Sequence, residues 1–139
     1  MAADLKKPKC AQDFKNINQA LKELGNVAFD AALGQLTAHT ENGQIVMDNG
    51  VMGYTDGRTI TLNSWVNWAD PNNTAALLDS KPWIDRLINA EEAYLGASSM
   101  TTAQFMDFIL IHELNHYNST IGDPDNQGCA KQLWKDCVQ

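Results

Sequence analysis

The chain has 139 residues, of which 44% are hydrophobic and 19% charged, a composition that suits one folded domain and argues against a disordered chain. Its net charge of −7 argues against nucleic acids and anionic membranes as partners, because their phosphates would be repelled. No stretch approaches the roughly 20 apolar residues that a membrane-spanning helix needs. We therefore expect a single domain over residues 1–139.

The N-terminal part of the chain has helical patterning. From residue 11 onward, apolar residues such as Phe14, Ile17 and Leu21 recur at helical spacing. We expect one long helix or two shorter helices that end near Gly34, with Gly25 as the point where the helix could break or stop.

The middle of the chain changes to short β-prone runs separated by Gly and Asp-Gly pairs. These runs predict strands near Gln44–Met47 and Arg58–Leu62. If the second strand lies at a sheet edge beside the site described below, a substrate peptide could add to it; an ordinary paired strand is the alternative. We place His39 in a turn at the surface, and we expect residues 63–74, which are rich in Asn and Asp, to form a loop.

The C-terminal part is expected to be helical again. Residues 74–99 have helical patterning that is interrupted near Pro82 and ends at Gly96. A new helix follows, with Ser99 or Thr101 as its cap. The order of helix, strands and helices predicts an α+β domain, mostly helical, with a small sheet.

The stretch ILIHELNHYNSTIGDPD, residues 109–125, carries the most specific motif. His112 and His116 are four residues apart, so a helix presents both on one face and both can bind one Zn2+. Glu113 lies roughly 100° around the helix and can reach a water at the metal without binding the metal itself. This is the arrangement that a metal-dependent hydrolase needs. The alternative is a pair of hydrogen-bonded structural histidines.

A third ligand has to come from elsewhere, because a catalytic zinc usually has three protein ligands and one open position. Asp123 and Asp125 lie seven and nine residues after His116, and we expect Asp123 to be the ligand, with Asp125 as the second choice. The other aspartate could bond a histidine N–H or cap the last helix. An upstream ligand, Glu91 or Glu92, is the further alternative.

The chain has three cysteines, at positions 10, 129 and 137. Cys129 and Cys137 are eight residues apart; in a helix they would be separated by roughly 12 Å, too far for a disulfide. Cys10 could pair with either of them, and three buried thiols are the alternative. No Cys-x-x-Cys pair is present, which argues against a zinc site built from cysteines.

The HELNH motif at residues 112–116 resembles that of the zincin metallopeptidases, in which His-Glu-x-x-His lies on an active-site helix beneath a small twisted sheet. The rest of the chain resembles small bacterial secreted metallopeptidase-like domains, with a cysteine before a helical segment and another in a final helix. The resemblance implies His112 and His116 as zinc ligands, Glu113 as general base and a Cys10–Cys137 disulfide. Short-spacer zincins have a glycine and a third ligand where this chain has Ser119 and Gly122, so the resemblance does not identify the subfamily or its substrate preference.

From this pattern we expect a zinc-dependent endopeptidase that binds one Zn2+ per chain and cleaves a protein or peptide. The alternatives are a zincin-like binding module without catalysis and a toxin-like effector released from a larger secreted protein. We expect the protein to lie outside the cell or in the periplasm, with its leader absent from this chain; a cytoplasmic protein is the alternative. Tyr94 and Tyr117 could donate to an oxyanion, but we expect both to be core residues.

Overall fold

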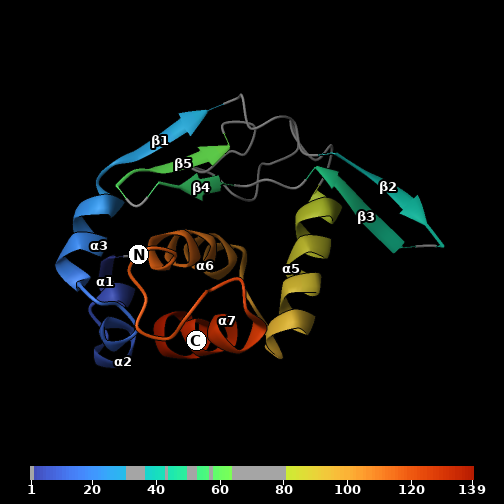
Figure 1. Ribbon diagram of the computed structural model, residues 1–139. Coiled ribbons are helices and arrows are strands. Elements are labelled where there is room, and N and C mark those ends of the chain that lie inside the picture. Colours follow the sequence, from blue (N-terminus) through green and yellow to red (C-terminus); the bar gives the residue numbers. More distant parts are fainter. Residues whose placement is uncertain (1, 31–36, 43, 50–52, 57, 64–80) are drawn as a thin grey trace.

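The computed structural model describes residues 2–30, 37–42, 44–49, 53–56, 58–63 and 81–139 (Figure 1). Within these ranges the helices are α1 (Ala2–Leu5), α2 (Pro8–Gln12), α3 (Ile17–Leu24), α5 (Lys81–Leu95), α6 (Thr102–Asn115), α7 (Gln127–Leu133) and the π-helix η2 (Trp134–Val138). The strands are β1 (Val27–Asp30), β2 (Thr37–Glu41), β3 (Gln44–Asn49), β4 (Gly53–Thr55) and β5 (Ile60–Asn63). This largely helical chain with short strands agrees with the α+β class expected from the sequence.

Strand β5 lies in the middle of a three-stranded sheet with the order β1-β5-β4. It pairs in parallel with β1 and antiparallel with β4. The strand predicted at Arg58–Leu62 therefore exists with slightly later bounds, but it is not at an edge as the peptide-addition idea required. Among the described strands of this sheet, β4 holds the edge position on the side of α6, and α6 contacts both β4 and β5.

The helix expected to continue to Gly34 instead ends at Leu24, and β1 begins at Val27. Gly25 closes the last turn, with its N–H donating to the carbonyl of Lys22 at 3.1 Å. Val27–Asp30 then gains a parallel partner in Ile60–Asn63, so pairing with a distant segment decides its conformation. Residues 31–36 lie outside the described part of the chain.

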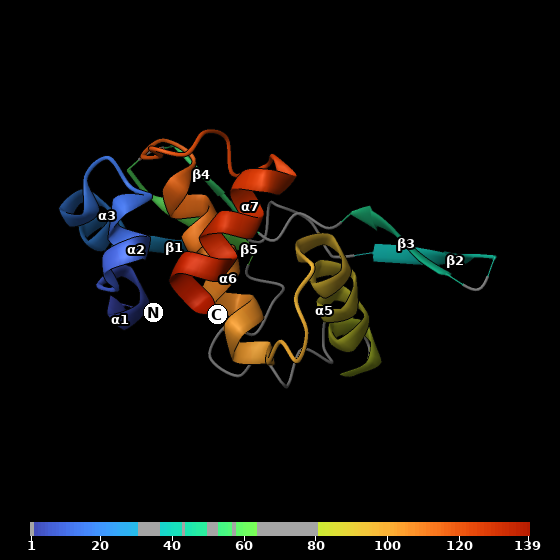
Figure 2. The ribbon, with the colours of Figure 1, turned by 90° about the horizontal axis from the view of Figure 1, so that it is seen from below.

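Within the described residues, a second sheet is formed by β2 and β3, which pair antiparallel and project away from the helices in both views (Figure 1, Figure 2). Strand β3 confirms the strand predicted near Gln44–Met47. Strand β2 was not predicted, and His39, which pairs with Val46, lies in this strand and not in a turn. The predicted loop at residues 63–74 falls almost entirely outside the described residues.

Local signals set the bounds of the two long helices. Pro82 lies in the first turn of α5, where it begins the helix and does not interrupt it; residues 74–80 are outside the described chain. Gly96 follows α5 with a φ of +67°, which a glycine adopts at no steric cost. Thr101 caps α6 in a capping box with Gln104: the Thr101 side chain accepts from the Gln104 N–H, and the Gln104 side chain accepts from the Thr101 N–H.

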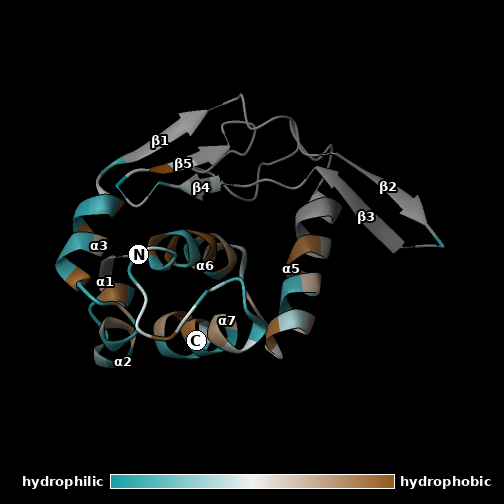
Figure 3. Ribbon diagram, in the orientation of Figure 1, coloured by the Kyte–Doolittle hydropathy of each residue, from teal (hydrophilic) through white to brown (hydrophobic). Residues whose placement is uncertain are grey.

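The core forms around α6, which lies between the three-stranded sheet and α7 with η2 (Figure 1, Figure 2). Ile111 and Leu133 are fully buried, and Phe108 meets Trp134 edge to face with ring centroids 5.8 Å apart. Figure 3 shows α6 with many apolar residues and α3 as mostly hydrophilic. The motif helix is therefore held on two sides by apolar packing. Among the described helices, none combines the length and apolar character needed to span a bilayer.

A disulfide joins Cys10, in α2, to Cys137, in η2, as the resemblance implied. The Lys7 ammonium group adds a hydrogen bond of 2.8 Å to the carbonyl of Cys137. Cys129 is the cysteine left free. The disulfide therefore links α2, near the N-terminus, to η2, near the C-terminus.

Asp13, three residues after Cys10, connects the segment beside the disulfide to the end of α6 and the residues that follow it. Its backbone carbonyl accepts from the Thr120 N–H and from the Asn115 side-chain amide, each at 3.0 Å. Its carboxyl group accepts from Gln132 at 3.2 Å. The side chain is only 3% exposed. This burial, with the neighbouring Asp136 carboxyl group, raises the pKa of Asp13 to about 6.

Removal of the disulfide is expected to destabilise the fold strongly. The two cysteines are 127 residues apart, and a cross-link over a long loop restricts the unfolded chain most. The Cys10→Ser/Cys137→Ser double variant should lose roughly 2–5 kcal/mol in the free energy of unfolding, measured by urea denaturation. Cys129→Ser is the control and should unfold near the wild-type midpoint. A double variant as stable as the control would contradict this assignment.

Asp13 is expected to make the fold less stable as pH rises. Its carboxyl group binds a proton more tightly in the folded state, so this contribution is full below pH 3.8 and is lost as pH rises through about 6. Asp13→Asn, which stays neutral, should remove up to about 3 kcal/mol of that pH-dependent change in the free energy of unfolding. Urea denaturation on both sides of this pH range measures it, and an unchanged pH dependence in the variant would refute it.

Candidate metal centre

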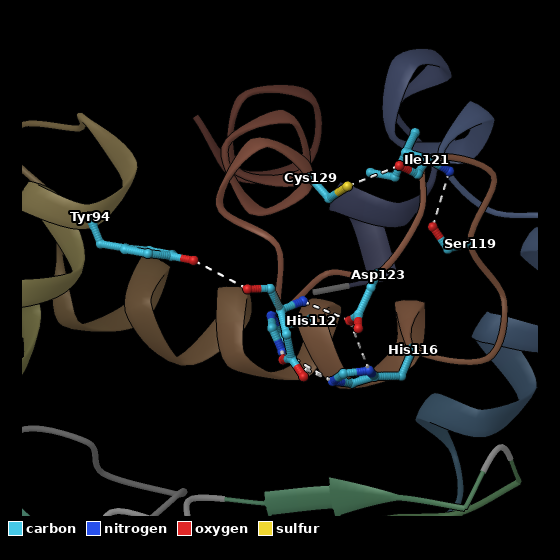
Figure 4. Close-up of polar contacts among 8 residues, drawn as sticks. Tyr94, His112, His116, Ser119, Ile121, Asp123 and Cys129 are labelled. Atoms are coloured by element: carbon cyan, nitrogen blue, oxygen red, sulfur yellow. Dashed lines mark hydrogen bonds and ion pairs between the residues drawn. The ribbon is translucent and has the colours of Figure 1, made fainter.

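The end of α6 places two histidines on one face, as their spacing predicted. His112 lies in the last turn of α6, and His116 immediately follows the helix as its C-cap. Figure 4 shows both rings directed toward the loop that carries Asp123. Each histidine side chain is about one quarter exposed, so both rings lie in a partly buried position that still opens to solvent.

Three atoms converge at this face. The Nε2 atoms of His112 and His116 are 3.2 Å apart, and Oδ1 of Asp125 lies 2.8 Å from the first and 3.3 Å from the second. Tetrahedral zinc with bonds of about 2.0–2.1 Å separates its ligand atoms by roughly 3.3 Å. The triangle formed by these three atoms therefore has nearly the dimensions of one face of a zinc coordination tetrahedron.

Pairwise hydrogen bonds satisfy this triangle poorly. An imidazole nitrogen directs a single proton or a single lone pair outward in the ring plane. The Nε2 atom of His112 nevertheless lies within hydrogen-bonding distance of two atoms, His116 Nε2 and Asp125 Oδ1. The Nε2 atom of His116 likewise lies close to two atoms, His112 Nε2 and Asp125 Oδ1. A cation at the centre of the triangle would use all three atoms at once.

Asp123 lies on the other side of the His116 ring. Its Oδ1 atom is 3.8 Å from Nδ1 of His116, the nitrogen that points away from the triangle. The same oxygen accepts from the backbone N–H of Asp125 at 2.9 Å and so helps to shape the loop. The sequence favoured Asp123 over Asp125 as the third ligand, whereas the distances favour Asp125. His116, Asp123 and Asp125 also form a second close group of potential ligands.

A sharp turn brings both aspartates back to the histidines. Gly122 has a φ of +105°, a conformation that side-chain-bearing residues rarely adopt, and Pro124 after it is fully buried. The thiol of Cys129 donates to the carbonyl of Ile121 at 2.9 Å (Figure 4). Asn126 caps α7 by accepting from the Gly128 N–H, so neither aspartate is the cap.

Tyr94 tethers the same loop from the end of α5. Its hydroxyl group donates to the backbone carbonyl of Asp125 at 3.2 Å (Figure 4), and Gln127 donates back to the Tyr94 carbonyl at 2.8 Å. Tyr94 is 39% exposed and Tyr117 is 67% exposed, so the expectation that both belong to the core is wrong. Helical spacing did not indicate this contact, because the two residues come from segments more than thirty positions apart.

The N-terminal segment holds the chain just after the motif. Asn118 exchanges two hydrogen bonds with the backbone of Asn16, both at 2.8 Å, and Phe14 and Ser119 form an antiparallel bridge. Asn118 is buried, so these bonds satisfy polar groups that water reaches poorly. No sequence pattern indicated this contact, since it joins residues about one hundred positions apart.

Burial sets the protonation of the site. It lowers the pKa of His112, with His116 acting in the same direction, and Asp125 opposes the shift. A neutral ring is the form that can bind a metal. Burial also raises the pKa of Glu113 to about 7, with further contributions from Asp125 and Glu23. Glu113 can therefore accept and return a proton near neutral pH.

A cleft of about 310 Å³ opens onto this site. Its walls include Gly53 and Thr55 of β4 on one side and Glu113, His116 and Tyr117 on the other. The catalytic candidate Glu113, the two metal-ligand candidates His116 and Asp125, and the edge strand therefore share one cleft. Glu91 and Glu92 are in neither close group of potential ligands among the described residues, and His39 lies in β2.

Comparison of the chain with protein-family models, curated proteins and solved structures finds no match. The interpretation of the site consequently rests on the geometry of its own residues.

Gly122 is expected to tolerate alanine poorly. An added Cβ would lie 3.2 Å from the Cys129 sulfur, in addition to the strain of a φ of +105°. Gly122→Ala should therefore lower the free energy of unfolding by more than Gly96→Ala, for which about 1–2 kcal/mol of strain is expected and no steric contact. Thermal unfolding compares the two variants, and Gly122→Ala/Cys129→Ala should recover part of the loss. Equal losses in both single variants would contradict the contact.

Proposed function

We propose that this protein is a zinc-dependent endopeptidase with a zincin-like site. The observation that carries the proposal is the triangle of His112 Nε2, His116 Nε2 and Asp125 Oδ1, whose sides of 2.8–3.3 Å fit one metal ion. Glu113 belongs to a close group with both histidines and lines the same cleft. Two imidazoles and one carboxylate form a donor set that suits zinc.

Each residue then has a distinct role. His112, His116 and Asp125 would hold the metal, and Asp123 would orient the His116 ring through Nδ1. Zinc in such a site polarises a carbonyl group and lowers the pKa of water toward about 7. Glu113 takes the proton of the attacking water and passes it to the leaving amine, a task that suits its raised pKa of about 7.

The position of β4 supports a peptide as substrate. Gly53 and Thr55 of this strand line the cleft opposite Glu113, and β4 is the described strand at that edge of its sheet. An extended peptide that added to β4 would pass directly over Glu113. Peptide addition is thus reassigned from β5, the strand expected from the sequence, to β4. The Cys10–Cys137 disulfide supports a place in an oxidising compartment, outside the cell or in the periplasm.

Metal analysis of purified variants tests the site. The wild type should bind about one zinc per chain, and His112→Ala or His116→Ala should abolish that binding. Asp123→Ala should weaken zinc affinity by about 10–100-fold, the usual effect of losing a group that orients a ligand. Asp125→Ala should weaken it more, since it removes the ligand itself. A wild type without affinity for zinc would end the proposal, and equal effects of the two aspartates would overturn the assignment of Asp125.

Cleavage of an unfolded protein by the zinc-loaded enzyme tests the reaction. Glu113→Gln should keep the zinc and the fold but reduce kcat by about 10²–10⁴-fold, because the proton acceptor is lost. Glu91→Gln, another half-buried glutamate, is the matched control and should remain active. A zinc-bound wild type that cleaves nothing would instead favour a binding module, and cleavage of one protein only would favour a toxin-like effector.

A further inference from the structure

A second and larger cavity, of about 570 Å³, lies next to the cleft of the metal site. One wall is the exposed side of α3, with Gln19 and Lys22, and another is Arg58 in the turn between β4 and β5. Figure 3 shows that α3 is mostly hydrophilic. The metal site does not account for this cavity, because none of the ligand candidates lines it.

One hydrogen bond lies between the cleft of the metal site and the second cavity. Thr55 lines the cleft, Glu23 lines the second cavity, and the Thr55 hydroxyl group donates to the Glu23 carboxyl group at 2.6 Å. Glu23 is 4% exposed and Thr55 is half-buried, so this bond forms a partly buried wall common to both. A peptide that extended along β4 from Glu113 would run past this wall toward Arg58.

The charge at the second cavity is opposite to that of the whole chain. The protein carries a net charge of −7, yet two exposed cationic side chains, Lys22 and Arg58, line this cavity together with a single carboxyl group, that of Glu23. Burial raises the pKa of the Glu23 carboxyl group, which already accepts a hydrogen bond from the Thr55 hydroxyl group. Asp56 is the nearby carboxylate, and its Oδ1 already accepts from the N–H groups of Arg58 and Thr59, each at 2.9 Å.

We propose that this cavity is a specificity pocket for an acidic side chain, Asp or Glu, of the peptide substrate. The proposal rests on the proposed peptidase function and names its substrate class. The guanidinium group of Arg58 can bind a carboxylate through two N–H donors, and Lys22 adds a second cation. Arg58 lies in the turn just beyond the end of β4, so the acidic residue of a peptide added to β4 would lie a few positions to one side of the cleaved bond.

Cleavage of a peptide library by the zinc-loaded wild type tests the pocket. Peptides with Asp or Glu at one fixed position should have a kcat/KM about tenfold above that of peptides with Asn or Gln there, since loss of one charge-assisted contact has about that effect. Lys22→Gln/Arg58→Gln should remove the preference, so that acidic and neutral peptides are cleaved with about equal kcat/KM. Lys22→Glu/Arg58→Glu should invert it in favour of Lys and Arg. Lys131→Gln/Lys135→Gln, which makes the same charge change on α7 and η2, should keep the wild-type preference.

The outcomes separate the pocket from the peptidase proposal. Cleavage without preference for acidic residues, or a preference that persists in Lys22→Gln/Arg58→Gln, would overturn the pocket and leave the peptidase standing. If the wild type cleaves no peptide, the peptidase proposal fails, and fluorescence anisotropy with the same labelled peptides decides the pocket. Tighter binding of acidic peptides by the wild type, lost in Lys22→Gln/Arg58→Gln, would support the pocket, and equal binding of acidic and neutral peptides would overturn it.

Discussion

The site depends on hydrogen bonds between the segment after α6 and the residues around Asp13. The Asp13 carbonyl accepts from Asn115 and Thr120, and Asn118 is bound to the backbone of Asn16. These bonds stop the chain from continuing in the direction of the motif helix. Only after this reversal can the loop at residues 122–125 return to His112 and His116. The candidate metal site, which looks local in sequence, thus requires the N-terminal segment.

The motif itself could be predicted because it is local. Residues four apart on a helix share a face whatever the rest of the chain does, so His112 and His116 were placed correctly. The third carboxylate could not be selected in this way. Asp123 and Asp125 differ in their position relative to the histidines because of the turn at Gly122 and the contact of Tyr94 with Asp125. Spacing alone favoured Asp123, and the three-dimensional distances favour Asp125.

The difference between local patterns and long-range contacts also explains which helices and strands could be predicted. The cap at Thr101 and the end of α5 at Gly96 follow from neighbouring residues, and both were predicted. Strand β1 was expected to be helical, because its pattern gave no sign that Ile60–Asn63 would pair with it. The disulfide came from resemblance in layout, whereas spacing left its pairing open. Contacts between distant segments therefore could not be predicted from the sequence. They include the hydrogen bond between Thr55 and Glu23.

The Cys10–Cys137 bond also affects what a break in the backbone would do. The bond encloses nearly the whole chain, including the projecting β2–β3 ribbon and the cleft. A single cut anywhere between the two cysteines would leave two pieces that remain one covalent molecule under oxidising conditions. The halves could not diffuse apart, so the noncovalent contacts between them would persist at a high effective concentration. If this protein is a peptidase, as proposed, a single cut made by another copy of itself would therefore not separate the two pieces.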